Sequence, residues 1–369
     1  MDANGNRAGP HCWQRRGSAK PAARGELLDK VRSKRAVIAI AVCIVILSAL
    51  ILAFWPRLPS VFMALVLQGT TGGFLGPAIA AISLGLVGHA ALAERLGRNQ
   101  RFASIGALVG AALMGAVGYL VSYQAIFLFV ALLGLPLFVA LARIRADDIH
   151  FGRSCGAPGH YGVEQPPRAG RGILRDSRLV IFATSLFLFQ LANASVLPLA
   201  GEALVRRSET DSSVVISALI IVPQVIVALM APWVGRQAES WGRRPLLLIG
   251  FAALPIRALG FALISDPLML IANQALDGIT AAVLGVLTAL VVADITGGTG
   301  RFNLAQGIVG TASGIGASIS TTLSGFIAER FGQSAGFFCI TAIALLATMV
   351  VLFLMPETKP QTNPSRAQH

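Results

Sequence analysis

Long apolar stretches alternate with short polar segments along most of the chain. Ten of the stretches approach the roughly 20 residues that a helix needs to cross the hydrocarbon core of a bilayer. None of them shows the period-two alternation of a membrane β-barrel strand. The pattern predicts an all-α polytopic membrane protein with ten transmembrane helices, over Ala36–Trp55, Val61–Val87, Phe102–Val121, Ala125–Ala142, Leu179–Ala200, Val214–Val234, Pro245–Ile264, Leu268–Val292, Asn303–Ile327 and Ala335–Leu354.

One polar segment is much longer than the others and separates the fourth span from the fifth. It is rich in Arg, Gly and Pro, as linkers are. The sequence therefore predicts two half-bundles, with four and six helices. The five parts are a polar leader (1–24), the first half-bundle (25–142), the linker (143–178), the second half-bundle (179–355) and a tail (356–369).

Charge orients the spans. The chain of 369 residues is 55% hydrophobic and only 13% charged, yet its formal net charge is +13. In a soluble protein this charge would suggest a nucleic-acid partner. Here most of the 30 Lys and Arg fall on one side when the polar segments alternate across the bilayer, and such a bias marks the cytoplasmic side. We therefore expect a protein of the cell (inner or plasma) membrane that contacts lipid, has both termini in the cytoplasm and binds no nucleic acid.

The two halves share weak internal repeats. In the same order along each half, Gly25–Arg35 recurs as Gly235–Pro245, Gln68–Gly76 as Asp277–Gly285, and Arg101–Gly110 as Arg301–Gly310. Such recurrence is a signature of transporter folds built from repeats. Two spans precede the second copy of the first repeat, and none precedes the first copy. We interpret the ten spans as a twelve-helix arrangement without its first two helices.

The first repeat has a glycine, an acidic residue and a basic cluster at fixed spacing. The matching residues are Gly25, Asp29, Arg32, Lys34 and Arg35 in one copy, and Gly235, Glu239, Gly242, Arg243 and Arg244 in the other. Together with the segment Pro356–Lys359 (PETK), this pattern resembles the cytoplasmic loop signature of the major facilitator superfamily (MFS) of secondary transporters. The resemblance implies a gate loop that latches one state of alternating access. The alternative is a positively charged topology anchor without a latch.

Polar residues inside the spans are the best candidates for a substrate cavity, because uncompensated polar groups are costly in a membrane. Hydrogen bonding between helices, worth about 0.6 kcal/mol on average, is the alternative role. The candidates are Gln68, Gln190, Asn193, Gln224, Asn273 and Gln274.

Two charged residues lie at similar depth inside neighbouring spans. At 1.5 Å per residue, Arg257 is about 18 Å from the cytoplasmic end and Asp277 about 14 Å from the other face. Because a lone charge at that depth is costly, we predict an ion pair. Its role is structural in the first reading, and a proton or substrate switch in the second. Asp294, nearer the end of its span, is expected to contact water.

Glycines in the third and ninth spans are spaced four residues apart. The pairs Gly106/Gly110 and Gly310/Gly314 predict close helix contacts, since small residues let backbones approach.

The function predicted is secondary transport of a small-molecule substrate, with or without proton coupling, by a monomer. Export is favoured over import. The sequence has no catalytic motif and no metal-ligand spacing of cysteines, so we expect no enzyme activity, cofactor or metal site. The alternative from another class is a truncated, transport-incompetent remnant that serves as a membrane scaffold.

Overall fold

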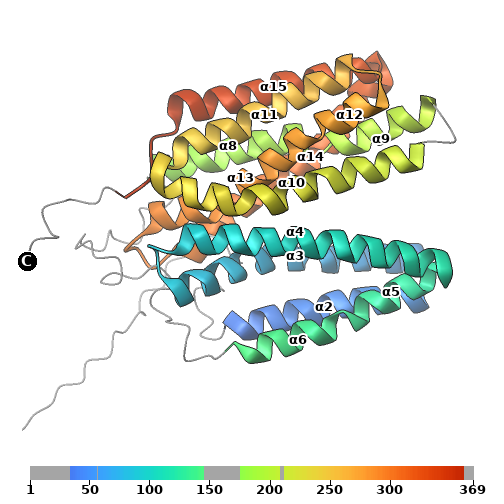
Figure 1. The fold of residues 1–369 in the computed structure, drawn as a ribbon, viewed down its shortest axis with the longest axis horizontal. Coiled ribbons are helices and arrows are strands. Elements are labelled where there is room, and N and C mark those ends of the chain that lie inside the picture. The colour runs from blue at the N-terminus through green and yellow to red at the C-terminus, as the bar shows by residue number, and fades with distance from the viewer. Residues whose placement is uncertain (1–33, 56, 145–174, 208–211, 361–369) are drawn as a thin grey trace, which may run out of the picture.

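The described residues are almost entirely helical, with no strand among them (Figure 1). The computed structural model describes residues 34–55, 57–144, 175–207 and 212–360. The helices are α2 (Lys34–Phe54), α3 (Leu58–Val87), α4 (Leu92–Leu120), α5 (Tyr123–Leu132), α6 (Gly134–Arg143), α8 (Ser177–Asn193), α9 (Val196–Arg207), α10 (Ser212–Trp241), α11 (Arg243–Leu263), α12 (Pro267–Asn273), α13 (Ala275–Thr296), α14 (Phe302–Phe331) and α15 (Gln333–Leu354).

Length and composition make most of these helices membrane spans. Within the described ranges, eight helical segments are long and apolar enough to cross a bilayer. Two further helices, α3 and α14, have 30 residues each and contain more Gly, Ser and Thr. The fold is that of an all-α polytopic membrane protein. The count of ten spans and the five predicted parts remain predictions, as does the absence of two initial helices.

Three of the predicted spans are broken rather than continuous. The breaks lie at Leu133, at Ala194–Ser195 and at Gln274. Proline explains the second break: Pro198 has no backbone N–H, so it cannot donate to the carbonyl of Ala194. Gln274 ends α12 and begins α13, and its carbonyl accepts a hydrogen bond from the backbone N–H of Asp277 at 3.0 Å.

Helix α4 begins at Leu92, ten residues before the predicted span. The polar segment that we expected to be a loop is helical because it is amphipathic. Leu92, Ala93 and Leu96 are buried, while Glu94 and Arg98 on the exposed face form an i,i+4 ion pair at 2.5 Å. Hydropathy alone located the membrane stretch and missed this extension.

The helices form two bundles, which Figure 1 shows one above the other. Helices α2 to α6 belong to one bundle, and α8 to α15 to the other (Figure 1). Equivalent neighbours recur: α2 packs on α3 and α5, as α11 packs on α13 and α15. The sequence repeats relate α2 to α11 and α3 to α13. Between the bundles, α4 packs on α10 and α13, and α3 packs on α14.

The predicted glycine contacts are wrong. A Cβ atom added to Gly106, Gly310 or Gly314 would meet nothing within 4 Å. Close backbone approaches occur instead at other glycines, among them Gly97 and Gly235, where α4 crosses α10, and Gly316, where α14 meets α8. Spacing identified helix faces rich in glycine but not the faces that make contact.

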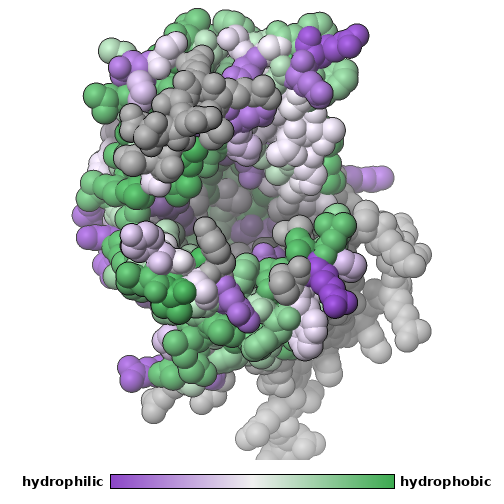
Figure 2. Space-filling view, turned by 90° about the vertical axis from the view of Figure 1, so that its right-hand side faces the viewer, coloured by the Kyte–Doolittle hydropathy of each residue, from purple (hydrophilic) through white to green (hydrophobic). Residues whose placement is uncertain are grey.

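The end of the molecule at which α3, α10 and α15 finish is called the gate end here. Seen from the opposite end, the molecule is hollowed between the two bundles, with polar residues inside the hollow (Figure 2). The bundles are thus in close contact at the gate end and apart at the other.

Candidate functional site

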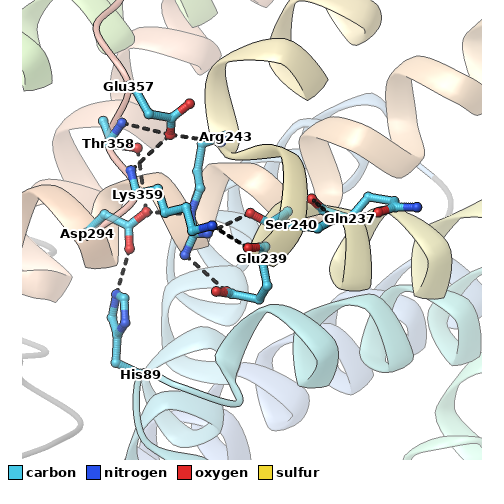
Figure 3. Close-up of polar contacts among 10 residues, drawn as sticks. His89, Gln237, Glu239, Ser240, Arg243, Asp294, Glu357, Thr358 and Lys359 are labelled. Carbon is cyan, nitrogen blue, oxygen red and sulfur yellow. Dashed lines mark hydrogen bonds and ion pairs between the residues drawn. The ribbon is translucent and has the colours of Figure 1, made fainter. Parts of the chain in front are cut away.

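Charged side chains from distant parts of the chain meet at the gate end (Figure 3). The gate-end cluster consists of His89, Glu239, Arg243, Asp294 and Glu357. They come from the α3–α4 turn, the end of α10, the start of α11, the last turns of α13 and the segment after α15. Two of them, Glu239 and Arg243, belong to the predicted second gate-loop copy.

Arg243 is the centre of this cluster and is only 1% exposed. Its Nε donates to Asp294 Oδ2 at 2.8 Å, and its Nη2 donates to Glu239 Oε1 at 3.1 Å. Its Nη1 donates to the carbonyl of Ala238 at 2.7 Å. Every nitrogen of the guanidinium therefore has a partner, which is the condition under which a buried charge is tolerated.

Asp294 connects the two bundles. Its Oδ2 accepts from Arg243, and its Oδ1 lies 2.6 Å from Nε2 of His89, which belongs to the other bundle. No hydrogen-bond donor is aligned with Oδ1, so the approach of His89 is a close polar contact between the bundles. The side chain of Asp294 is 0% exposed, and our expectation that it contacts water is wrong. Residues far away in sequence cover it.

Glu357 of the PETK segment caps the start of α11. Its carboxylate accepts from the backbone N–H groups of Arg243, Arg244, Thr358 and Lys359. Burial raises the pKa of Glu357, but these four hydrogen bonds outweigh burial and hold its pKa below the usual 4.5. Gly242 makes room for this cap. Its φ is +95°, and a Cβ there would lie 2.5 Å from Glu357 Oε2.

Two further basic residues form hydrogen bonds between the PETK region and the α10–α11 turn. Arg244 Nη2 donates to the carbonyl of Leu352 at 2.6 Å, and Lys359 Nζ donates to the carbonyl of Glu239. The end of the chain is thereby tied to the α10–α11 turn.

Glycine brings the bundles into backbone contact beside this cluster. A Cβ on Gly97 would lie 2.6 Å from the carbonyl oxygen of Ala231, and one on Gly235 would lie 2.5 Å from that of Ala93. Real Cβ atoms do not approach so closely, so the crossing of α4 and α10 requires glycine at both positions.

The first gate-loop copy is largely outside the described residues, which begin at Lys34. This applies to Gly25, Asp29 and Arg32. Lys34 starts α2, and Arg35 is half-buried near the same end of that helix.

A second polar cluster lies midway along the helices of the later bundle. The midspan cluster consists of Asn193, Arg257, Asn273 and Asp277. Nη1 of Arg257 donates to Asp277 Oδ1 and, at 2.9 Å, to Asn193 Oδ1. Nδ2 of Asn273 donates to the carbonyl of Arg257 at 2.9 Å. The structure thus joins the two charged residues to two of the predicted cavity residues.

The remaining predicted cavity residues lie apart. Gln68 donates to Ser48 Oγ at 3.4 Å within the earlier bundle. Gln190 and Gln224 are half-buried and do not hydrogen bond to the midspan cluster. Gln274 is next to the cluster in sequence and 1% exposed, and its Oε1 has no hydrogen-bond partner in the described part of the chain.

Comparison with known proteins assigns the family. The model of the Major Facilitator Superfamily matches residues 17–204 and 182–369. An uncharacterized MFS-type transporter of Mycobacterium tuberculosis is 35% identical over 335 residues, which is 90% of this chain and 80% of the relative. This chain belongs to the Major Facilitator Superfamily.

Other relatives of this MFS transporter cover less of the chain or share only the fold. The class B tetracycline resistance protein of Escherichia coli is 34% identical over 39% of this chain and 35% of its own length. The proton:xylose symporter XylE, bound to 6-bromo-6-deoxy-D-glucose, superposes with a TM-score of 0.71 at 14% identity, covering 92% of this chain and 84% of its own. The transporter FucP in its outward conformation superposes with a TM-score of 0.66 at 14% identity, covering 92% of this chain and 86% of its own.

The family assignment places the protein in a membrane as a transporter rather than an enzyme, with relatives that include efflux proteins. Sequence reasoning missed three residues of its gate-end cluster: His89, Asp294 and Glu357. The PETK segment was recognised as part of the family resemblance, but its contact with α11 was not anticipated. Nothing in the local sequence indicated that His89 and Asp294 meet.

Proposed function

We propose that this MFS transporter moves small solutes by rocker-type alternating access, that it exports them, and that both termini lie in the cytoplasm. The gate end is then the cytoplasmic end. The form described here is open to the outside.

The observation that carries this proposal is the unequal contact between the bundles. At the gate end they touch through Gly97, Gly235 and the His89–Asp294 contact. At the opposite end they are separated by a hollow with polar residues inside (Figure 2). A transporter that rocks must break the first set of contacts and close the second opening.

The contacts at the gate end suit a surface that opens and closes. Helix α4 meets α10 by direct backbone approach at Gly97 and Gly235. His89 is 16% exposed, and its link to Asp294 can be lost without uncovering Arg243, whose partners all belong to the later bundle. The later bundle therefore keeps its own ion pairs intact when the bundles part.

Export and proton coupling rest on relatives and on chemistry. Tetracycline and multidrug resistance proteins are among the relatives, and the XylE structure is described as that of a proton symporter. Within this chain, Asp277 is the carboxylate we assign to proton coupling. It lies in the midspan cluster and its side chain is 25% exposed.

The test measures the distance between the two bundles at each end of the same protein. Spin labels on Arg98→Cys and Ser240→Cys report the gate end, and labels on Leu120→Cys and Leu268→Cys report the opposite end. All four side chains are exposed, and each pair spans the two bundles. In proteoliposomes, we expect a fraction of molecules in which the gate-end distance lengthens while the opposite distance shortens, and a pH gradient should change that fraction.

Transport is measured in parallel in everted vesicles with tetracycline and ethidium. Accumulation of either driven by a pH gradient supports export. Distances that never change in either pair, together with no flux, would overturn the proposal in favour of the transport-incompetent remnant, which the comparisons do not favour.

A further inference from the structure

Two broken helices meet at the midspan cluster. Asn193 is the last residue of α8 before its break, and Asn273 is the last residue of α12 before its break. Asp277 lies in the first turn of α13. Between them, α11 is continuous and presents Arg257. Broken helices place backbone dipole ends and polar side chains at mid-membrane depth, where transporters bind ions and substrates.

Arg257 has more hydrogen-bonding capacity than the described chain uses. Only Nη1 has partners, and Nε is buried without one. The side chain is 2% exposed. The side-chain oxygen of Gln274, next to the break, is also buried without a partner. Buried donors without partners are uncommon and costly, so they call for a physical explanation.

Asp277 is the one charged partner that this arginine has among the described residues. The central spans that pack around the pair have no other charge: residues 179–200 of α8 and α9, 215–234 of α10, 268–276 of α12 and 333–354 of α15 contain no Asp, Glu, Lys or Arg. Asn193, Asn273 and Gln274 are neutral. The charge balance at mid-membrane depth therefore depends on Asp277 alone.

Protonation of Asp277 would leave the charge of Arg257 without a partner. If Asp277 takes up a proton, its charge disappears and Arg257 remains as a buried cation at mid-membrane depth. An uncompensated charge there costs several kcal/mol or more, and a guanidinium keeps its proton at all accessible pH values. The helix N-terminus of α13 favours an anion at the same place. A second anion is needed whenever Asp277 is neutral.

We propose that Arg257 binds the anionic group of the transported substrate, a small organic acid, and that it does so when Asp277 is protonated. A carboxylate fits the planar guanidinium and replaces the carboxylate of Asp277. Protonation of Asp277 and binding of the organic anion then offset each other, and net charge in the site does not change. This inference rests on the proposed transport function and adds the chemical class of its substrate.

The experiment uses acetate as the probe, because it is a small carboxylate with an uncharged isostere, acetamide, which serves as the control ligand. The full chain is purified in detergent as wild type, as Asp277→Asn, and as the double variant Asp277→Asn/Arg257→Gln. The midpoint of thermal unfolding is followed while acetate or acetamide is added.

We expect acetate to raise the midpoint of Asp277→Asn by several degrees, because a ligand that binds only the folded state stabilises it. The double variant should not respond, since it has no cation to neutralise. Acetamide should have no effect on any of the three. In the wild type, the response to acetate should increase as the pH is lowered, and in Asp277→Asn it should not depend on pH.

Equal responses of Asp277→Asn and the double variant would overturn the proposal. If Asp277→Asn does not fold, the wild type still decides: an acetate response that does not change with pH contradicts the proposal. The spin-label distances test alternation without reference to acetate. If acetate does not bind as expected but the spin-label distances still alternate, the proposed anion site is wrong and the proposed transport function is unaffected.

Discussion

Two arginine–aspartate ion pairs join the same two helices, α11 and α13. Arg243 pairs with Asp294 at the gate end, and Arg257 pairs with Asp277 midway along the helices. Both arginines are almost fully buried, at 1% and 2% exposure. The two pairs differ in how completely the donors of the arginine are satisfied.

At the gate end, all three nitrogens of the Arg243 guanidinium have acceptors, and the carboxylate of Asp294 is fully buried. At the midspan pair, Arg257 Nε has no partner, and the carboxylate of Asp277 is 25% exposed. The gate-end pair is called the saturated pair because every donor of its arginine is bonded, and in a closed environment such a pair holds two helices at a fixed spacing. A pair with spare donors and a reachable carboxylate can change its protonation state and its partner.

The largest effect is expected from Asp294→Asn. The change removes the buried counter-charge of Arg243 and leaves only the exposed Glu239 beside it. Breaking a buried pair in this way costs about 3–5 kcal/mol. The thermal unfolding midpoint in detergent measures the loss. The control is Glu94→Gln, which breaks an exposed pair and should cost about 1 kcal/mol or less. Equal midpoints for the two variants would show that the gate-end pair is not a structural anchor.

A smaller effect is expected at the midspan pair, and it should be asymmetric. Arg257→Gln leaves an aspartate that is partly exposed and can be protonated, so the loss should be about 2–3 kcal/mol. Asp277→Asn leaves a buried cation and should cost more than Arg257→Gln. The double variant should recover much of the loss, because neither charge remains. Unfolding midpoints of the three variants check the order, and a double variant less stable than both single variants would contradict it.

Gly235→Val tests the contact between the bundles next to the saturated pair. The added side chain would overlap the carbonyl of Ala93 and should cost about 1–3 kcal/mol in the closed form. The gate-end spin-label distance should lengthen. Gly106→Ala is the matched control, since its Cβ would meet nothing within 4 Å and the distance should stay unchanged.

The smallest effect is expected from Glu357→Gln, which weakens the cap on α11 by about 0.5–1 kcal/mol. The folded-state pKa of Glu357 is below 4.5, so its stabilising contribution is complete above that value and is lost as the pH falls through the folded pKa. The wild type should therefore lose part of its advantage over Glu357→Gln on acidification below 4.5. A difference in unfolding midpoint that stays constant over this range would contradict the pKa assignment.

Much of the fold could be predicted because hydropathy is a local property. Apolar length located the membrane helices, the repeats related α2, α3 and α4 to α11, α13 and α14, and helix rise placed Arg257 and Asp277 at one depth. The breaks within α8–α9 and α12–α13 were not predicted, since hydropathy averaged over a whole span does not register an interruption of one or two residues. The polar residues beside them, Asn193 and Asn273, were interpreted as candidate cavity residues instead.

The amino-acid sequence by itself determined that this chain is an all-α membrane protein of the Major Facilitator Superfamily. Apolar length and repeated motifs are local properties of the sequence and do not depend on how the helices pack. Only the tertiary structure decided which glycines make contact, that Asp294 is buried between His89 and Arg243, and that Glu357 caps α11. The reason is physical. Burial and charge compensation depend on neighbours that are tens to hundreds of residues away, and these meet only when the helices pack.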